Sequence, residues 1–285
     1  MSALEFPERP AGLPERPVPD ERPWSPLWAL PVFLGGVILG TIAFVAAGEI
    51  RQALTDPPVH ADGVFGVALQ GTPPVVLFVS TLVQQLGWII ASILVAAWAL
   101  KGRVAGTALG LRPARLASSA GYVVLAYVTF ILLAALWTLV MDVQDRENVA
   151  VDLGTGDSVF AFVAGAILTT VMAPLAEELF FRGFLYGGLR KYGVPIAAIV
   201  SGLLFGAVHI GGSPIGFLVP LAALGIILAL LYERTGSLYP PIALHALNNS
   251  IAFGVSDGRA WMIPVCLAAS GLTVYGLSRV MVRTS

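Results

Sequence analysis

The chain contains 285 residues, of which 57% are hydrophobic and 12% are charged. Soluble globular domains carry about twice this fraction of charged residues, so the composition excludes an ordinary soluble protein. The 16 lysines and arginines nearly balance the 17 aspartates and glutamates, and the net charge of -1 excludes the basic surface that nucleic-acid binding requires. The single cysteine, Cys266, excludes an intrachain disulfide and a cysteine-rich zinc site.

Residues 1–24 differ in composition from the rest of the chain. The first 23 residues carry eight charges and six prolines, arranged in near-repeats of the form PERP. Such a segment has too little apolar surface to form a core, so we predict a disordered, proline-rich cytosolic tail. The segment lacks the features of a cleaved signal peptide, and the first apolar stretch is therefore expected to remain as an anchor.

The remaining chain is divided into uncharged apolar stretches of the length that a membrane span needs. About 20 apolar residues suffice for a helix to cross the hydrocarbon core, whereas buried helices of soluble proteins average about 11–12 residues. The sequence therefore predicts an all-α fold, a polytopic transmembrane helical bundle of about eight spans. The predicted spans are residues 25–47, 74–100, 117–141, 158–176 and beyond, 194–210, 215–232, 238–255 and 260–278.

The positions of the lysines and arginines predict the orientation of these spans. With eight crossings, thirteen of the sixteen cationic residues fall on the side of both termini and three fall on the other side. Because short cytoplasmic loops collect lysine and arginine, both termini are expected in the cytoplasm. We predict a multi-pass integral membrane protein, with the plasma membrane as its location.

Ionisable groups at membrane depth are costly, so they mark candidate functional sites. Glu177, Glu178 and Arg182 lie along the fourth predicted span, and His209 and His245 interrupt the fifth and the seventh. Glu178 and Arg182 are four residues apart on one helix face, which predicts an ion pair. Glu177 then points in another direction. One carboxylate and two imidazoles, each from its own helix, are expected to converge on an enclosed cavity.

The chemistry of such a cavity leaves two mechanisms open. Desolvation raises the pKa of a buried carboxyl group and nearby cations lower it, so Glu177 can be tuned to act as a base towards water. Asn249, four residues after His245, offers a hydrogen bond to a developing oxyanion. Alternatively, Glu177, His209 and His245 match the two-histidine, one-glutamate ligand set of some catalytic zinc sites, so a divalent metal such as zinc is the other possibility.

Three short motifs carry a resemblance to a known family. They are EELFFR at residues 177–182, FGAVH at 205–209 and HALNN at 245–249, which match EExxxR, FxxxH and HxxxN. In this order on successive membrane segments, they resemble the CAAX protease and bacteriocin-processing family of intramembrane endopeptidases, which includes the type II CAAX prenyl endopeptidases. The resemblance covers residues 158–255.

The resemblance implies roles for individual residues. Glu177 and His209 activate the attacking water, while His245 and Asn249 stabilise the tetrahedral intermediate. Glu178 and Arg182 support them, and Phe205 is expected to pack behind His209. The family is described both as metalloproteases and as glutamate-dependent proteases, and our leading hypothesis requires no metal cofactor.

We therefore expect an intramembrane endopeptidase that cleaves a membrane-associated or lipid-modified protein. Its sequence leaves the substrate and the oligomeric state open. A proton-coupled transporter is the alternative, but no internal repeat relates the two halves. A catalytically inactive membrane scaffold is disfavoured because every motif position is filled. The expected organisation is the tail at 1–24, three N-terminal spans at 25–157, and the catalytic membrane core with the last span at 158–285.

Two further groups of residues are expected to serve packing. Gln84 and Gln85, in the second predicted span, are interpreted as interhelical hydrogen-bonding residues rather than catalytic groups. Small residues let membrane helices approach closely, and this role is predicted for four glycines: Gly40, Gly202, Gly206 and Gly225.

Overall fold

In a computed structural model of the protein, residues 22–54, 73–101, 105–114, 116–143, 158–210, 213–256 and 258–284 are described. Within these ranges the secondary structure is helical. The helices are η1 (Pro26–Trp28), α1 (Ala29–Leu54), α2 (Pro74–Ala99), α3 (Ala105–Ala108), α4 (Leu116–Val140), α6 (Val159–Ile167), η2 (Leu168–Met172), α7 (Ala173–Glu178), η3 (Leu179–Tyr186), α8 (Gly187–Leu189), η4 (Arg190–Tyr192), α9 (Val194–Ala207), α10 (Ile215–Thr235), α11 (Tyr239–Ser256) and α12 (Met262–Thr284).

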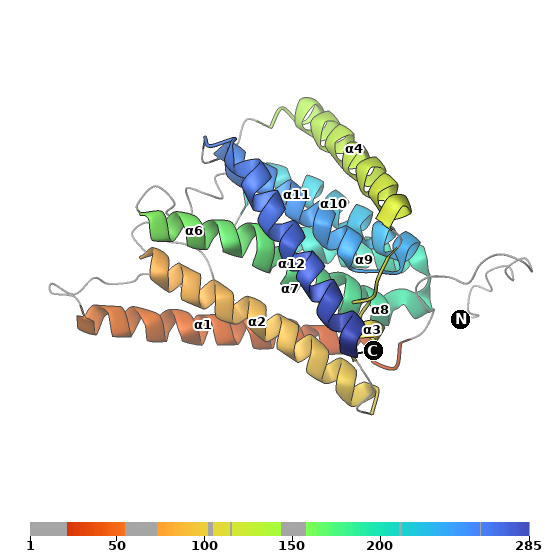
Figure 1. Cartoon of the computed structure of the whole chain (residues 1–285), viewed down its shortest axis with the longest axis horizontal. Coiled ribbons are helices and arrows are strands. Elements are labelled where there is room, and N and C mark those ends of the chain that lie inside the picture. Colours follow the sequence, from red (N-terminus) through yellow and green to blue (C-terminus); the bar gives the residue numbers. More distant parts are fainter. Residues whose placement is uncertain are drawn as a thin grey trace, which may run out of the picture.

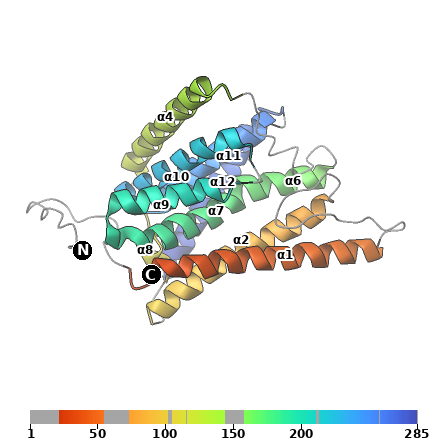
Figure 2. The same cartoon turned by 180° about the vertical axis from the view of Figure 1, so that it is seen from behind.

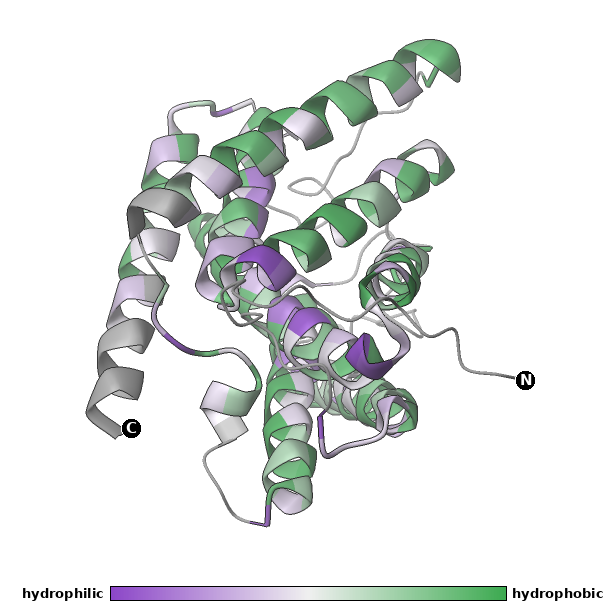
Figure 3. Ribbon diagram, turned by 90° about the vertical axis from the view of Figure 1, so that its right-hand side faces the viewer, coloured by the Kyte–Doolittle hydropathy of each residue, from purple (hydrophilic) through white to green (hydrophobic). Residues whose placement is uncertain are grey.

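The helices form a bundle with α1 and α2 on one side and α4 on the other (Figures 1 and 2). The continuous run from α6 to η4, together with α9, α10, α11 and α12, fills the middle. The start of α1 and the end of α12 lie at the same end of the bundle in both views. Hydrophobic residues cover most of the helical length, and hydrophilic residues are confined to a few turns and connections (Figure 3). This distribution suits a bundle whose outer surface faces lipid.

Five helical segments in the described part of the chain are long and apolar enough to cross a membrane. They are Pro26–Arg51, Pro74–Ala99, Ser119–Val140, Val159–Tyr192 and Ile215–Thr235. The all-helical prediction is confirmed, and a helix forms at each of the eight predicted segments. Among the described helices, only these five are long and apolar enough to be candidate membrane spans.

The other three segments fall short for identifiable reasons. Helix α9 has 14 residues, or about 21 Å at 1.5 Å per residue, which is less than the roughly 30 Å of a hydrocarbon core. Helix α11 has 18 residues but carries His245, Asn248 and Asn249 in its middle, which lower its hydropathy. In α12 the described residues Met262–Thr273 form a shorter apolar stretch.

Glycines allow the closest helix contacts of the bundle, as predicted. A Cβ atom added at Gly202 in α9 would lie 2.6 Å from the backbone nitrogen of Ile226 in α10, and one at Gly225 would lie 2.8 Å from the Gly202 Cα. Gly206 of α9 faces the backbone of α10, and Gly40 of α1 lies against Gln84 of α2. The packing role of all four glycines is therefore confirmed.

The start of the described chain is fixed to the core by Trp24. Its side chain is 2% exposed, its ring stacks on Phe184 with centroids 5.5 Å apart, and its Nε1 donates to the Phe184 carbonyl oxygen at 2.9 Å. Residues 1–21 of the predicted tail lie outside the described residues. Because Trp24 is buried, the packed structure begins before the predicted tail boundary at residue 24.

Candidate active site

The two glutamates lie in a helical run whose backbone changes pitch on both sides of them. Helix α7 ends at Glu178, and π-helical segments precede it at Leu168–Met172 and follow it at Leu179–Tyr186. Pro174 stands in the first turn of α7 and has no N–H to donate, so an ordinary α-helical ladder cannot continue through it. π-helical turns are rare and occur frequently at functional sites. Sequence analysis missed both segments, although Pro174 marked an interruption.

Glu178 is the central charged group of a fully buried network. Its Oε1 accepts from Arg182 Nη1 at 2.8 Å, and both side chains are 0% exposed. The same oxygen lies 2.8 Å from His245 Nδ1. Arg182 also donates through Nη2 to the Gly225 carbonyl oxygen at 2.9 Å. The predicted ion pair forms, and Glu178 additionally orients His245, which sequence analysis did not predict.

Glu177 differs from its neighbour in both exposure and partners. Its side chain is 14% exposed, and its Oε2 has no hydrogen-bond partner among the described residues. The nearest imidazole nitrogen is His245 Nε2, at 3.9 Å from this oxygen. The helical offset of about 100° between adjacent residues thus separates a fully buried carboxylate, whose Oε1 is held by Arg182 and His245, from a partly exposed one that lines the cavity.

The hydrogen bonds of the two histidines assign their ring nitrogens. His245 Nδ1 faces a carboxylate that already accepts from Arg182, so Nδ1 carries a proton and Nε2 faces Glu177. His209 lies just beyond the end of α9, and its Nδ1 donates to the Phe205 carbonyl oxygen at 2.7 Å. The Nε2 atom of neutral His209 is therefore the nitrogen that can accept a proton.

Phe205 packs between these charged and polar groups. Its ring centroid lies 5.0 Å from that of His209 and 5.5 Å from that of His245, and the Arg182 guanidinium lies 4.5 Å from it. The side chain is fully buried. Phe205 thus fixes both imidazoles from behind, which extends the contact with His209 that the sequence predicted.

Asn249 is oriented by the backbone of the π-helical segment η2. Its Nδ2 donates to the Thr169 carbonyl oxygen at 2.9 Å, and its Oδ1 lies 3.5 Å from Asn248 Nδ2. One of the two N–H groups of Nδ2 is occupied by Thr169, and the other is left for a ligand.

A cavity of about 320 Å³ brings most of the predicted residues together, although they come from different helices. This volume is at the lower end of the range for small-ligand pockets, about 300–1,000 Å³. Glu177, His209 and Asn249 line the cavity, whereas His245 lies behind Glu177 with a side chain only 3% exposed. Other polar residues also line it, and sequence analysis had assigned none of them to the site: Thr81, Gln84, Gln85, Thr169, Ser213 and Asn248.

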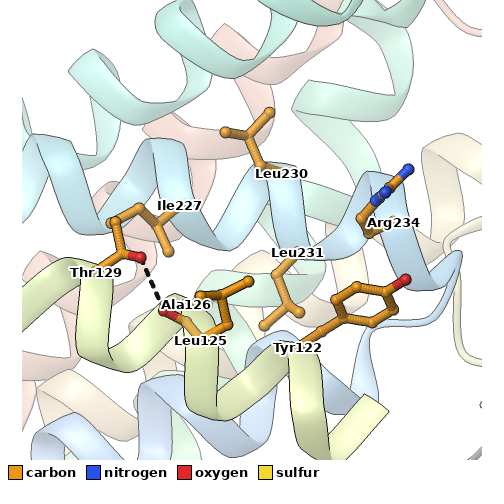
Figure 4. Close-up of a pocket in the computed structure, with 8 residues that line it drawn as sticks. All are labelled: Tyr122, Leu125, Ala126, Thr129, Ile227, Leu230, Leu231 and Arg234. Carbon is orange, nitrogen blue, oxygen red and sulfur yellow. Dashed lines mark hydrogen bonds between the residues drawn. The ribbon is translucent and has the colours of Figure 1, made fainter. Parts of the chain in front are cut away.

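A second cavity, of about 260 Å³, lies between α4 and α10 (Figure 4). Its lining is apolar except for Thr129 and, at one end, Tyr122 and Arg234. The Arg234 guanidinium lies 5.8 Å from the centre of the Tyr122 ring. Among the described residues, no acid or imidazole lines this cavity, whereas Glu177 and His209 line the first one.

Comparison with known proteins agrees with the motifs in this cavity. Residues 158–251, which contain all three motifs, match the profile of the type II CAAX prenyl endopeptidase Rce1-like family. The match covers about a third of the chain, and this part of the chain is similar to the Rce1-like family. This CAAX protease family supplies the expectation that the protein is a membrane peptidase.

Two known proteins match the chain over part of its length. One is "Putative membrane peptidase YdiL" of Bacillus subtilis, with 32% identity over 85 residues, or 30% of this chain and 34% of the relative. Another is UPF0177 protein YxdF of Lactococcus lactis, with 26% identity over 113 residues, or 39% of this chain and 62% of the relative. The chain thus covers about a third of the first relative and less than two thirds of the second. No solved structure matches the chain.

The zinc ligand set that the sequence left open was Glu177, His209 and His245. Among the described residues, no three histidine, cysteine, aspartate or glutamate side chains are arranged so that they could hold a metal ion. Nδ1 of His245 is engaged by Glu178 and Nδ1 of His209 by the Phe205 carbonyl, so Nε2 is the remaining nitrogen of both rings.

Proposed function

We propose that the protein is an intramembrane endopeptidase that hydrolyses a peptide bond of a membrane-associated or lipid-modified protein. The observation that carries the proposal is the pairing of two adjacent glutamates with different roles. Glu178 is fully buried and held through Oε1 by Arg182 and His245, whereas Glu177 is 14% exposed, lies beside His245 and lines the same cavity as His209 and Asn249.

In this proposal Glu177 and His209 activate water. A water molecule in the cavity donates a proton to the Glu177 carboxylate or to His209 Nε2 as its oxygen attacks the carbonyl carbon of the scissile bond. The proton is then passed to the leaving amine, which completes hydrolysis. The enclosure of the cavity within apolar helices strengthens each of these interactions relative to bulk water.

His245 and Asn249 are proposed to stabilise the tetrahedral intermediate. The Nδ1 atom of His245 is held by Glu178, and its Nε2 is directed towards Glu177. In the proposed role His245 Nε2 donates a hydrogen bond to the oxyanion, and the second N–H of Asn249 Nδ2 provides another donor. Preorganised donors of this kind are among the largest contributors to catalysis of acyl transfer.

We also propose that both termini face the cytoplasm of a cell whose plasma membrane holds the protein. The unequal distribution of lysine and arginine along the sequence supports this orientation. The location of the start of α1 and the end of α12 at one end of the bundle is consistent with an even number of crossings.

The experiment that tests the function uses the purified full chain in proteoliposomes. Wild-type protein, Glu177→Ala and His209→Ala are incubated with a pool of labelled peptides, with and without an S-farnesyl cysteine, and products are identified by mass spectrometry. We expect cleavage by the wild type and a loss of about a hundredfold or more in each variant. Undiminished cleavage by both variants would refute the proposal, and proton-driven uptake lost in Glu177→Gln would favour the transporter instead.

A further inference from the structure

A polar stripe on α2 forms a wall of the candidate active site. Thr81, Gln84, Gln85 and Trp88 line the cavity that contains Glu177. Their spacing is i, i+3, i+4 and i+7, which places them on one face of a helix. Helix α2 lies outside residues 158–251, the part of the chain that matches the Rce1-like family. The stripe is therefore a feature of the site that the family motifs do not contain.

Gln85 has an unpaired side-chain oxygen, and Gln84 packs against a neighbouring helix. Gln85 is 6% exposed, and its Oε1 is buried with no hydrogen-bond partner among the described residues. Gln84 packs against α1 at Gly40, where an added Cβ would lie 3.1 Å from the Gln84 Oε1 atom. Buried polar atoms in proteins are almost always paired, and polar groups are especially costly at membrane depth. An unpaired amide oxygen at a cavity wall therefore indicates a ligand that pairs with it.

Trp88, the last residue of the polar stripe, is held in place by its neighbours. Trp88 donates through Nε1 to the Phe33 carbonyl oxygen at 3.0 Å, and its ring stacks on Phe33 and Phe180 with centroids 5.3 and 5.8 Å apart. Phe180 belongs to the helical run that carries Glu177, so Trp88 connects the polar face of α2 to the catalytic segment. This connection fixes the distance between the glutamines and the proposed catalytic groups.

We propose that Gln84 and Gln85 bind the main chain of the peptide substrate in the cavity shared with Glu177. A carboxamide both donates and accepts hydrogen bonds, as does a peptide group, so the pair recognises main-chain N–H and C=O groups whatever the substrate side chains are. The glutamines act as substrate-binding residues and take no part in proton transfer. This inference rests on the proposed peptidase function.

The kinetic test uses Gln85→Leu and Gln84→Leu/Gln85→Leu, which retain similar side-chain volume and remove the hydrogen-bonding groups. Loss of one such bond corresponds to about a two- to tenfold effect, so we expect KM to rise about tenfold in the single variant and further in the double variant, with kcat changed less than about threefold. The pH dependence of kcat is expected to match that of the wild type. A KM equal to the wild-type value in both variants would mean that the glutamines serve only helix packing.

Ser92→Ala is the matched control. Ser92 lies on the same helix, is fully buried, and has an Oγ atom without a hydrogen-bond partner among the described residues, but it does not line the cavity. Its KM is expected to stay within about twofold of the wild type. If Ser92→Ala raises KM as much as Gln85→Leu, the effect reflects general disturbance of α2, and the proposal is wrong.

A binding measurement separates this inference from the proposed catalysis. A fluorescein-labelled peptide pool, with and without S-farnesyl, is titrated with Glu177→Gln protein in detergent, with and without the two leucine substitutions. We expect the substitutions to weaken binding at least fivefold. Equal binding by both proteins, or no binding to Glu177→Gln at all, overturns the role of the glutamines. Glutamine-dependent binding together with cleavage that survives Glu177→Ala would retain this role and reject only Glu177 as the proposed catalytic base.

Discussion

His245 Nδ1 lies 2.8 Å from the Glu178 Oε1 atom, although the two residues are 67 positions apart in the sequence. The same oxygen accepts from Arg182, so one carboxylate joins an intrahelical ion pair to an imidazole of α11. All three side chains are at most 3% exposed. The stability of the bundle and the orientation of His245 therefore depend on one buried acid.

Removal of this acid should destabilise the protein. Glu178→Ala leaves the Arg182 guanidinium buried without its carboxylate, and breaking a buried pair in this way costs about 3–5 kcal/mol. We expect a clear fall in Tm in detergent for Glu178→Ala. Glu178→Ala/Arg182→Met, which removes both charges, should recover part of this loss. An unchanged Tm in Glu178→Ala would show that the ion pair contributes little to folding.

Glu177→Gln, in contrast, should leave the stability almost unchanged and strongly reduce cleavage. The side chain is partly exposed, and its Oε2 has no hydrogen-bond partner among the described residues, so the neutral variant should unfold within about 0.5 kcal/mol of the wild type. Peptide cleavage should fall by about 10²–10⁴-fold because the proposed base is lost. Parallel unfolding and cleavage assays on Glu177→Gln and Glu178→Ala check this separation, which fails if Glu177→Gln is the less stable variant.

Asn249 and Asn248 form a matched pair for the proposed oxyanion site. Asn249→Ala removes a donor oriented by the Thr169 carbonyl, and we expect kcat to fall by about 10²–10³-fold. Asn248 also lines the cavity, but its contact with Asn249 is long at 3.5 Å. Asn248→Ala should therefore reduce kcat by less than about tenfold. Equal losses in the two variants would argue against a specific role for Asn249.

The glycine contact between α9 and α10 can be tested without any activity assay. In Gly202→Ala the new methyl group meets the backbone of α10, which cannot yield as a flexible side chain would, and we expect a destabilisation of about 1–3 kcal/mol. The control is Gly121→Ala on α4, where nothing lies within 4 Å of the added Cβ. That variant should be as stable as the wild type or more stable, because alanine favours helix. Denaturation in detergent compares the two, and equal stability would contradict the close contact.

The sequence by itself determined the features that depend on local chemistry. Long uncharged apolar stretches predict helices because backbone groups must be paired internally in lipid, and helices form at every predicted segment. The spacing of Glu178 and Arg182 predicts their ion pair because residues four apart share a helix face. The motif residues Glu177, His209 and Asn249 likewise come to one cavity.

Only the tertiary structure decided the features that depend on contacts between distant segments. Helical periodicity shows which face a residue occupies but not what that face meets. It therefore could not show that Glu178 also engages His245, or that Gln84 and Gln85 face Glu177 across a cavity. It also could not show that α9 ends at Ala207, because an apolar sequence does not reveal where packing terminates a helix. These features were set by how the helices pack, and packing joins residues that no local pattern relates.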